Sequence, residues 1–170
     1  MTKSIRRTSV IALAVILMIA MTASAFAGSL TKKEAVNKAL KDAGTSKSKV
    51  YALQSERDGN KYEIEFIKKK NNAEYDYEIS VGGRILEKNV DYVYRHNSSR
   101  SKIGKNAARK KVSKFSGIKL SIVSNGSCRY EYDDGEGIYE VKFRKGHYKY
   151  DYDVLAPTGK IIEYSRDYVR

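Results

Sequence analysis

In Tyr62-Glu63-Ile64-Glu65-Phe66, large apolar or aromatic side chains alternate with carboxylates. Successive side chains of a β-strand point to opposite faces, so this alternation is typical of a strand with one buried and one solvated face. The pattern returns in Tyr75-Asp76-Tyr77-Glu78-Ile79. We therefore expect antiparallel strands whose Tyr, Ile and Phe side chains build a core beneath an acidic face.

Both stretches recur 75 to 77 residues further along the chain, as Tyr139-Glu140-Val141-Lys142-Phe143 and Tyr150-Asp151-Tyr152-Asp153-Val154. Gly83-Arg84-Ile85-Leu86 likewise recurs as Gly159-Lys160-Ile161-Ile162. Matches at nearly constant spacing indicate an internal repeat, with the small length differences falling in loops.

A helix precedes the strands in each copy. Thr31 and Glu34 have the spacing of a capping box, and an Ala-rich apolar stripe runs from Ala35 to Gly44. In the second copy Ala108, Val112 and Phe115 form the stripe, and no capping box precedes it. Strands follow at Val50–Arg57 and Lys61–Lys68, joined by an Asp-Gly turn, and a short last strand is expected at 84–87 and again at 160–164. The predicted fold class is α+β, with two tandem repeats, each one helix packed on a three- to four-stranded antiparallel sheet.

The amino terminus has the order of a secretory signal peptide. Basic residues up to Arg7 precede an apolar run from Val10 to Ala20, and Ala25-Phe26-Ala27 supplies small residues for cleavage. A retained membrane anchor is the alternative, although the apolar run is shorter than the ~20 residues that span a bilayer. The predicted organisation is therefore a signal peptide (1–27), a first unit (28–94), a linker (95–102) and a second unit (103–170), in a secreted or cell-envelope protein.

Motifs for catalysis are missing from the sequence. His96 and His147 lie in no metal-binding spacing, and no nucleophile elbow, phosphate loop or dinucleotide fingerprint is present. Cys128 is the only cysteine, so it is either a half-buried strand residue or a site of pairing between chains. We predict a protein that is not an enzyme, without catalytic residues, metal ligands or cofactor, although a site built from residues distant in sequence stays open.

Charge is unevenly distributed along this basic chain, whose formal net charge is +13. Residues 94–120 hold basic residues and no acid. This segment is either a solvated face or a surface that adheres to a polyanion such as a wall polymer or anionic lipid. Its candidate binding residues are Arg95, Arg100, Lys105, Arg109, Lys110, Lys111 and Lys114.

The opposite charge gathers on the solvated face of the predicted strands. The candidate residues there are Glu63, Glu65, Asp76, Glu78, Asp151 and Asp153. Like charges on neighbouring strands repel, so either lysines from adjacent strands or a cationic partner must compensate them. No nucleic-acid motif accompanies the basic segment, so we expect no specific nucleic-acid binding.

The Ala-rich helix ending in glycine, the Tyr-Glu-Ile/Val-x-Phe strand and the Tyr-x-Tyr-x-Ile/Val strand that leads to Gly-x-Ile resemble the PepSY domain family, here in tandem. Residues 157–162 are the best single match. The resemblance implies a secreted, non-enzymatic module that binds another secreted or surface protein, such as a peptidase that it inhibits or regulates. The alternative function is adhesion to anionic cell-wall or membrane polymers through the basic 94–120 segment.

Overall fold

The computed structural model describes residues 29–94, 101–133 and 135–169. The predicted signal peptide (1–27) lies outside these ranges, and so does most of the predicted linker (95–100).

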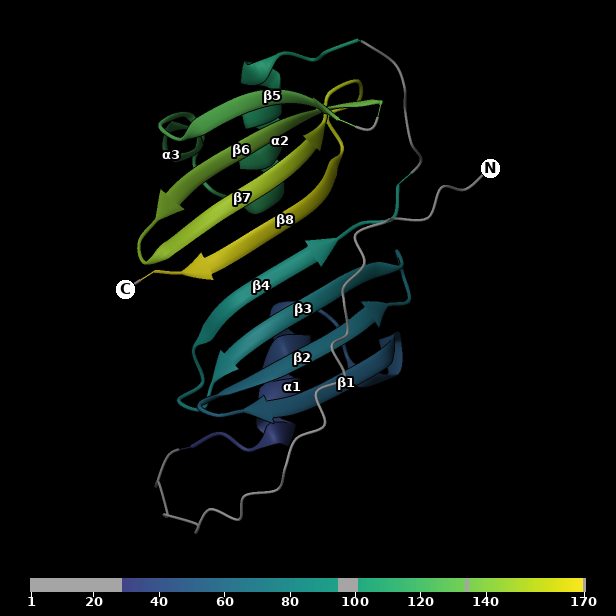
Figure 1. Cartoon of the computed structure of the whole chain (residues 1–170), viewed down its shortest axis with the longest axis vertical. Helices are drawn as coiled ribbons and strands as arrows, with labels where there is room; N and C mark the ends of the chain where they lie inside the picture. Colours follow the sequence, from purple (N-terminus) through teal and green to yellow (C-terminus); the bar gives the residue numbers. More distant parts are fainter. Residues whose placement is uncertain (1–28, 95–100, 134, 170) are drawn as a thin grey trace.

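Eight antiparallel strands form a single sheet in the order β1-β2-β3-β4-β8-β7-β6-β5 (Figure 1). The strands are β1 (Val50–Asp58), β2 (Lys61–Lys68), β3 (Ala73–Ser80), β4 (Ile85–Asp91), β5 (Ser127–Asp133), β6 (Glu136–Lys145), β7 (Tyr148–Leu155) and β8 (Ile161–Tyr168). Hairpins join consecutive strands from β1 through β4 and from β5 through β8. Each half of the chain therefore supplies one half of the sheet.

The prediction of two tandem helix-on-sheet units was wrong. Strand β4 pairs antiparallel with β8, from Glu87 opposite Asp167 to Asp91 opposite Glu163, and this pairing fuses the strands of both halves into one continuous sheet. A four-stranded unit ending at β4 would leave the backbone groups of that strand's outer edge unpaired. The pairing satisfies them, and it also explains why β4 and β8 are longer than the short last strands predicted from the sequence.

Three α-helices lie on one side of this sheet: α1 (Lys32–Asp42), α2 (Lys105–Ser116) and the short α3 (Leu120–Ser124) (Figure 1). The Thr31 hydroxyl accepts from the Glu34 amide at 3.3 Å while the Glu34 carboxylate accepts from the Thr31 amide at 2.7 Å, so the predicted capping box is confirmed. Helix α2 starts after Gly104 with no capping side chain, and α3 was not predicted. A 3₁₀ turn at Lys47–Lys49 leads into β1.

The predicted aromatic face of the strands is buried under the helices. Tyr62, Tyr75 and Tyr77 are at most 5% exposed and pack with Ala35, Ala39 and Leu40 of α1. In the C-terminal half, Ala108 and Val112 of α2 cover Tyr139, Val141 and Tyr152. Tyr92 and Tyr164 pack against both clusters, which joins the two cores across the β4–β8 pair.

Phe115 departs from the predicted helix stripe, because its side chain is 47% exposed. It lies at the flank of α2 in T-shaped contact with the rings of Tyr92, Tyr152 and Tyr164, at centroid distances of 5.7–6.2 Å. The helix therefore buries mainly Ala108 and Val112, and Phe115 covers the seam between the halves.

Candidate binding surfaces

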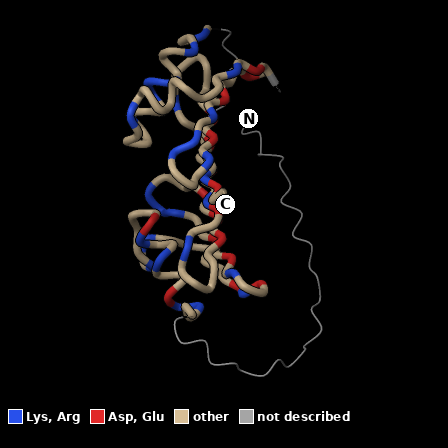
Figure 2. Tube along the Cα trace, turned by 90° about the vertical axis from the view of Figure 1, so that its left-hand side faces the viewer, with Lys and Arg blue, Asp and Glu red and all other residues tan. Residues whose placement is uncertain are grey.

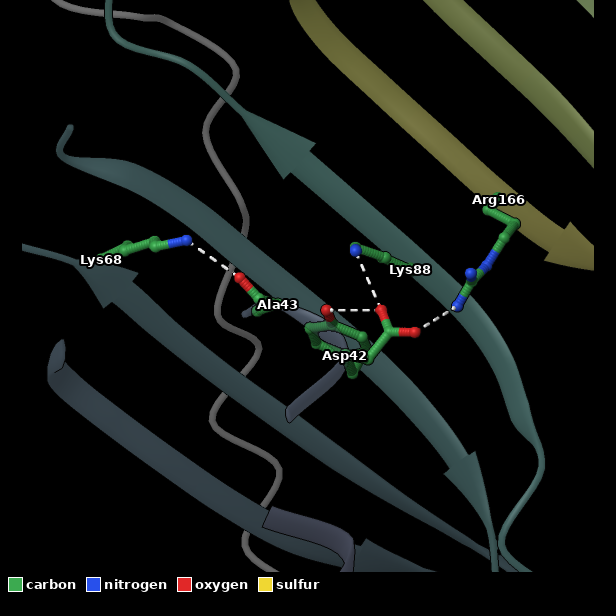
Figure 3. A network of polar contacts seen from close by, with 6 residues as sticks. Asp42, Ala43, Lys68, Lys88 and Arg166 are labelled. Carbon is green, nitrogen blue, oxygen red and sulfur yellow. Dashed lines mark hydrogen bonds and ion pairs between the residues drawn. The ribbon is translucent and has the colours of Figure 1, made fainter. Parts of the chain in front are cut away.

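One carboxylate at the end of α1 links the two halves on the helix side of the sheet (Figure 3). Asp42 accepts hydrogen bonds from Lys88 of β4 at 2.9 Å, from the Tyr77 hydroxyl at 3.0 Å and from Arg166 of β8 at 3.2 Å. Burial alone would raise the pKa of Asp42, but the hydrogen bond and charge of Lys88, with the charge of Arg166, hold it below its usual range. The network holds α1, β4 and β8 together and is a structural element of the seam.

The other face of the sheet carries the acidic residues. Apart from Glu34 and Asp42 of α1, every described Asp and Glu lies in a strand. Figure 2 shows the consequence edge-on: acidic positions follow the sheet, while the helical layer is mainly basic or uncharged. One row crosses five neighbouring strands, as Glu74, Asp91, Glu163, Asp153 and Glu140. We call the whole surface the acidic sheet face; it comprises Glu56, Glu63, Glu65, Glu74, Asp76, Glu78, Glu87, Asp91, Glu131, Glu140, Asp151, Asp153, Glu163 and Asp167.

A shallow hollow of about 220 Å³ lies on the N-terminal half of this face. Its polar lining comes from Glu63, Glu65, Asp76, Glu78, Glu87 and Asn89. Lys61 compensates part of this charge, because its ammonium lies 2.8 Å from Glu63 and 2.5 Å from Glu78. Asn89 donates to Glu87 at 2.6 Å. Lys61 is thus the adjacent-strand lysine that the sequence suggested for Glu78 of β3, and it also contacts Glu63 on its own strand.

Asp76 lies at the centre of the remaining charge. It is opposite Glu65 on one neighbouring strand and opposite Asn89 on the other. Burial, followed by the charges of Glu65, Glu74, Asp91 and Glu87, raises the pKa of Asp76 to about 7. This carboxyl group is thus partly protonated near neutral pH, and a cation placed beside it would favour its ionised form.

The C-terminal half has a second hollow of about 200 Å³, lined by Glu131, Glu140, Asp151, Asp153 and Glu163 among others. Lys142 contacts both Glu140 and Asp151, the latter at 2.9 Å. Burial raises the pKa of Asp151 even though Lys142 opposes the shift. One lysine in each half therefore bridges two carboxylates of the face.

The structure brings all six predicted acidic residues, Glu63, Glu65, Asp76, Glu78, Asp151 and Asp153, onto one face of one sheet. Sequence reasoning missed further members of this face, namely Glu56, Glu74, Glu87, Asp91, Glu131, Glu163 and Asp167. Alternation within Glu87-Lys88-Asn89-Val90-Asp91 was the available signal, since its odd-numbered residues share a face.

The predicted basic residues are distributed differently. Arg95 and Arg100 lie outside the described residues. Lys105, Lys110, Lys111 and Lys114 are exposed on α2. Arg109 is half-buried on the opposite flank from Lys111 and donates from Nη2 to the carbonyl of Gly126 at 3.4 Å. The exposed lysines leave an outward basic side on α2, to which Arg109 does not belong.

Across residues 29–94, 101–133 and 135–169 no group of three or more His, Cys, Asp or Glu side chains is placed to hold a metal ion. None of the helices in these ranges is long and apolar enough to cross a membrane.

Comparison with known proteins bears on the N-terminal half of the sheet. Residues 29–81 match the PepSY family. The family is described as "Peptidase propeptide and YPEB domain", and the matched residues contain α1 and β1–β3. The resemblance is confirmed for this part of the chain, whereas the second PepSY-like unit, at residues 103–170, stays a prediction.

Solved structures give weaker similarities. A proposed lipoprotein of Clostridium difficile is 18% identical over 79% of this chain and 91% of its own, with a TM-score of 0.31. A BLIP-like protein of Bacteroides fragilis is 16% identical over 79% of this chain and 86% of its own, also with a TM-score of 0.31. At these scores the likeness supports no conclusion about function. No curated protein matches the sequence.

Proposed function

We propose that this chain is an extracellular, non-enzymatic module that binds a secreted or surface protein through its acidic sheet face. The observation that carries the proposal is that all three described helices cover one side of the sheet, while the other side gathers the carboxylates of all eight strands. The match of residues 29–81 to a family described by peptidase propeptides supports a peptidase as one class of partner. The predicted signal peptide supports export.

The dimensions of the face favour a protein partner over a small molecule. Eight strands spaced about 4.8 Å apart make a surface roughly 34 Å wide, enough for the ~800 Å² that each partner contributes to a standard interface. The two hollows, at about 200 and 220 Å³, are smaller than ordinary small-molecule pockets of roughly 300–1,000 Å³. A broad face with shallow depressions suits side chains that project from another protein.

Charge complementarity defines the chemistry of that partner. Lysine or arginine side chains placed near Asp76, Glu65 and Glu87 would relieve the repulsion between these carboxylates and add charge-assisted hydrogen bonds. Such an interface associates faster at low ionic strength, because the attraction is screened over about 8–10 Å in physiological salt.

The test compares three forms of residues 28–170 as baits in the medium of the producing cells. Glu65→Gln, Asp76→Asn and Glu87→Gln together remove three carboxyl groups from the face. The control, Asn37→Lys, Asn106→Lys and Ser121→Lys, changes the net charge in the same direction and by a similar amount at exposed positions on the helix side. We expect a basic protein that the wild type and the control retain and the face variant loses. Equal retention by all three forms would overturn the proposal.

A second candidate function is adhesion to anionic wall polymers or lipid headgroups, and the exposed Lys110, Lys111 and Lys114 of α2 favour it. Co-sedimentation with isolated walls, or with vesicles containing anionic lipid, should then weaken steeply with salt and disappear on reversal of these three charges. Reversing Lys33, Lys38 and Lys41, which are exposed on α1, is the matched control. Binding that salt leaves unchanged, or that both variants lose equally, would reject this function.

A further inference from the structure

The two edge strands of the sheet, β1 and β5, differ in how they are protected from pairing with other strands. Strand β1 loses its register with β2 between Tyr51 and Gln54, where Ala52 adopts a φ of +50°. Such a bulge twists an edge away from other strands and prevents pairing. Strand β5 pairs with β6 from Ser127 to Asp133 without a break, and the single proline of the chain, Pro157, lies elsewhere. The outer edge of β5 therefore lacks the bulge that protects β1.

The hairpin between β5 and β6 determines which backbone groups this edge presents. Asp133 pairs with Glu136, three positions later in the chain. A closing pair at this spacing is a hydrogen-bonded pair, so the alternate pairs at Glu131, Arg129 and Ser127 are expected to be hydrogen-bonded as well. The residues between them, Cys128, Tyr130 and Tyr132, then direct their N–H and C=O groups away from β6. No described residue forms a backbone hydrogen bond with these outward groups.

We propose that β5 pairs antiparallel with β5 of a second copy of this chain, centred on Tyr130, and so extends the sheet across two molecules. Three facing pairs, Tyr130 with Tyr130 and Cys128 with Tyr132 in both directions, then exchange two backbone hydrogen bonds each. Tyr130 is held for this contact, because its ring lies 5.4 Å from that of Tyr139 and Lys102 lies 3.6 Å above it. Tyr132, which is 48% exposed, becomes covered.

The side chains of the acidic sheet face select this register. Centred on Tyr130, the pairing sets Arg129 opposite Glu131 of the second copy, and the symmetry repeats this pair. Registers centred on Arg129 or on Glu131 satisfy the same outward groups, but they set two arginines or two glutamates opposite each other, which is destabilising. The side chains of Arg129 and Glu131 are 73% and 50% exposed, and the ion pair between them, within one strand, is long at 3.6 Å. They are therefore free to reach across the dyad.

Charge exchange tests the register on residues 28–170, which contain all of the described structure. Sedimentation is measured near physiological salt, because this basic chain repels itself at low ionic strength. We expect a dimer that Arg129→Glu or Glu131→Arg alone weakens by about tenfold or more, since each variant creates two like-charge contacts. The double exchange, Arg129→Glu with Glu131→Arg, restores dimerisation. A wild type that stays monomeric up to about 1 mM, or singles that dimerise like the wild type, would overturn the proposal.

Disulfide trapping tests the same geometry independently. Chains carrying Cys128→Ser with Arg129→Cys are mixed with chains carrying Cys128→Ser with Glu131→Cys, and both are also oxidised alone. If the pairing is centred on Tyr130, the mixture should give cross-linked heterodimers. Each variant alone should stay uncrosslinked, because its two thiols are then offset by two residues, about 7 Å along the strands. Crosslinking of either variant alone, or none in the mixture, contradicts the proposed register.

Discussion

At the scale of single residues, Asp76 makes stability depend on pH. Its pKa is raised from 3.8 to about 7 in the folded state, so the folded protein holds this proton more tightly than the unfolded chain. Stability should therefore fall as the pH rises from about 4 to about 7, by roughly 1–2 kcal/mol once solvent screening is allowed for. Asp76→Asn should flatten this slope in urea unfolding measured between pH 4 and 8. The exposed Glu56→Gln is the control, and an unchanged slope for Asp76→Asn would contradict the assignment.

The ion pair between Asp42 and Lys88 should contribute to stability. Lys88 has a side chain that is only 8% exposed, so Asp42→Ala leaves its ammonium without its closest anion. We expect a loss of roughly 2–4 kcal/mol in unfolding free energy, and Asp42→Leu with Lys88→Met should recover part of it. Because the pKa of Asp42 is lowered on folding, its contribution is present above pH 4 and is lost as the pH falls further. A double variant as unstable as Asp42→Ala would argue against a paired charge.

At the scale of elements, the first turn of α1 depends on Thr31. Thr31→Ala removes the hydroxyl that accepts from the Glu34 amide and should cost about 1 kcal/mol, whereas Thr31→Ser should cost little. Thermal unfolding of both variants provides the measurement, and equal losses for Ala and Ser would exclude a capping role for the hydroxyl.

The elements that were predicted well are those marked by a motif within a few neighbouring residues of the sequence. The Thr31–Glu34 box starts α1, and alternation over Tyr62–Phe66 and Tyr75–Ile79 marks strands with a buried aromatic face. Helix α3 has only five residues and no capping side chain, so nothing in its sequence distinguishes it from a loop. Phe115 fits the helical stripe, but its position at the flank of α2 depends on where the tyrosines of β4, β7 and β8 lie.

At the scale of the whole molecule, the continuity of the sheet could not be predicted. The β4–β8 pairing joins segments about 76 residues apart through backbone groups that every residue possesses, and no turn motif marks it. The sequence therefore suggested two separate units. The same pairing creates the acidic sheet face, because it places Asp91 beside Glu163 and Glu87 beside Asp167. Two smaller acidic surfaces thereby become one.

The merged acidic sheet face should bind a cationic protein. Zero-length coupling of carboxylates to lysine amines, followed by mass spectrometry of the captured complex, tests it most directly, because a bond forms only where the two groups touch. We predict that the linked carboxylates of this chain are those around Asp76, namely Glu65, Glu74 and Glu87 as well as Asp76 itself. Links confined to Glu34 and Asp42 of α1, or a complex that yields none, would exclude binding through the acidic sheet face.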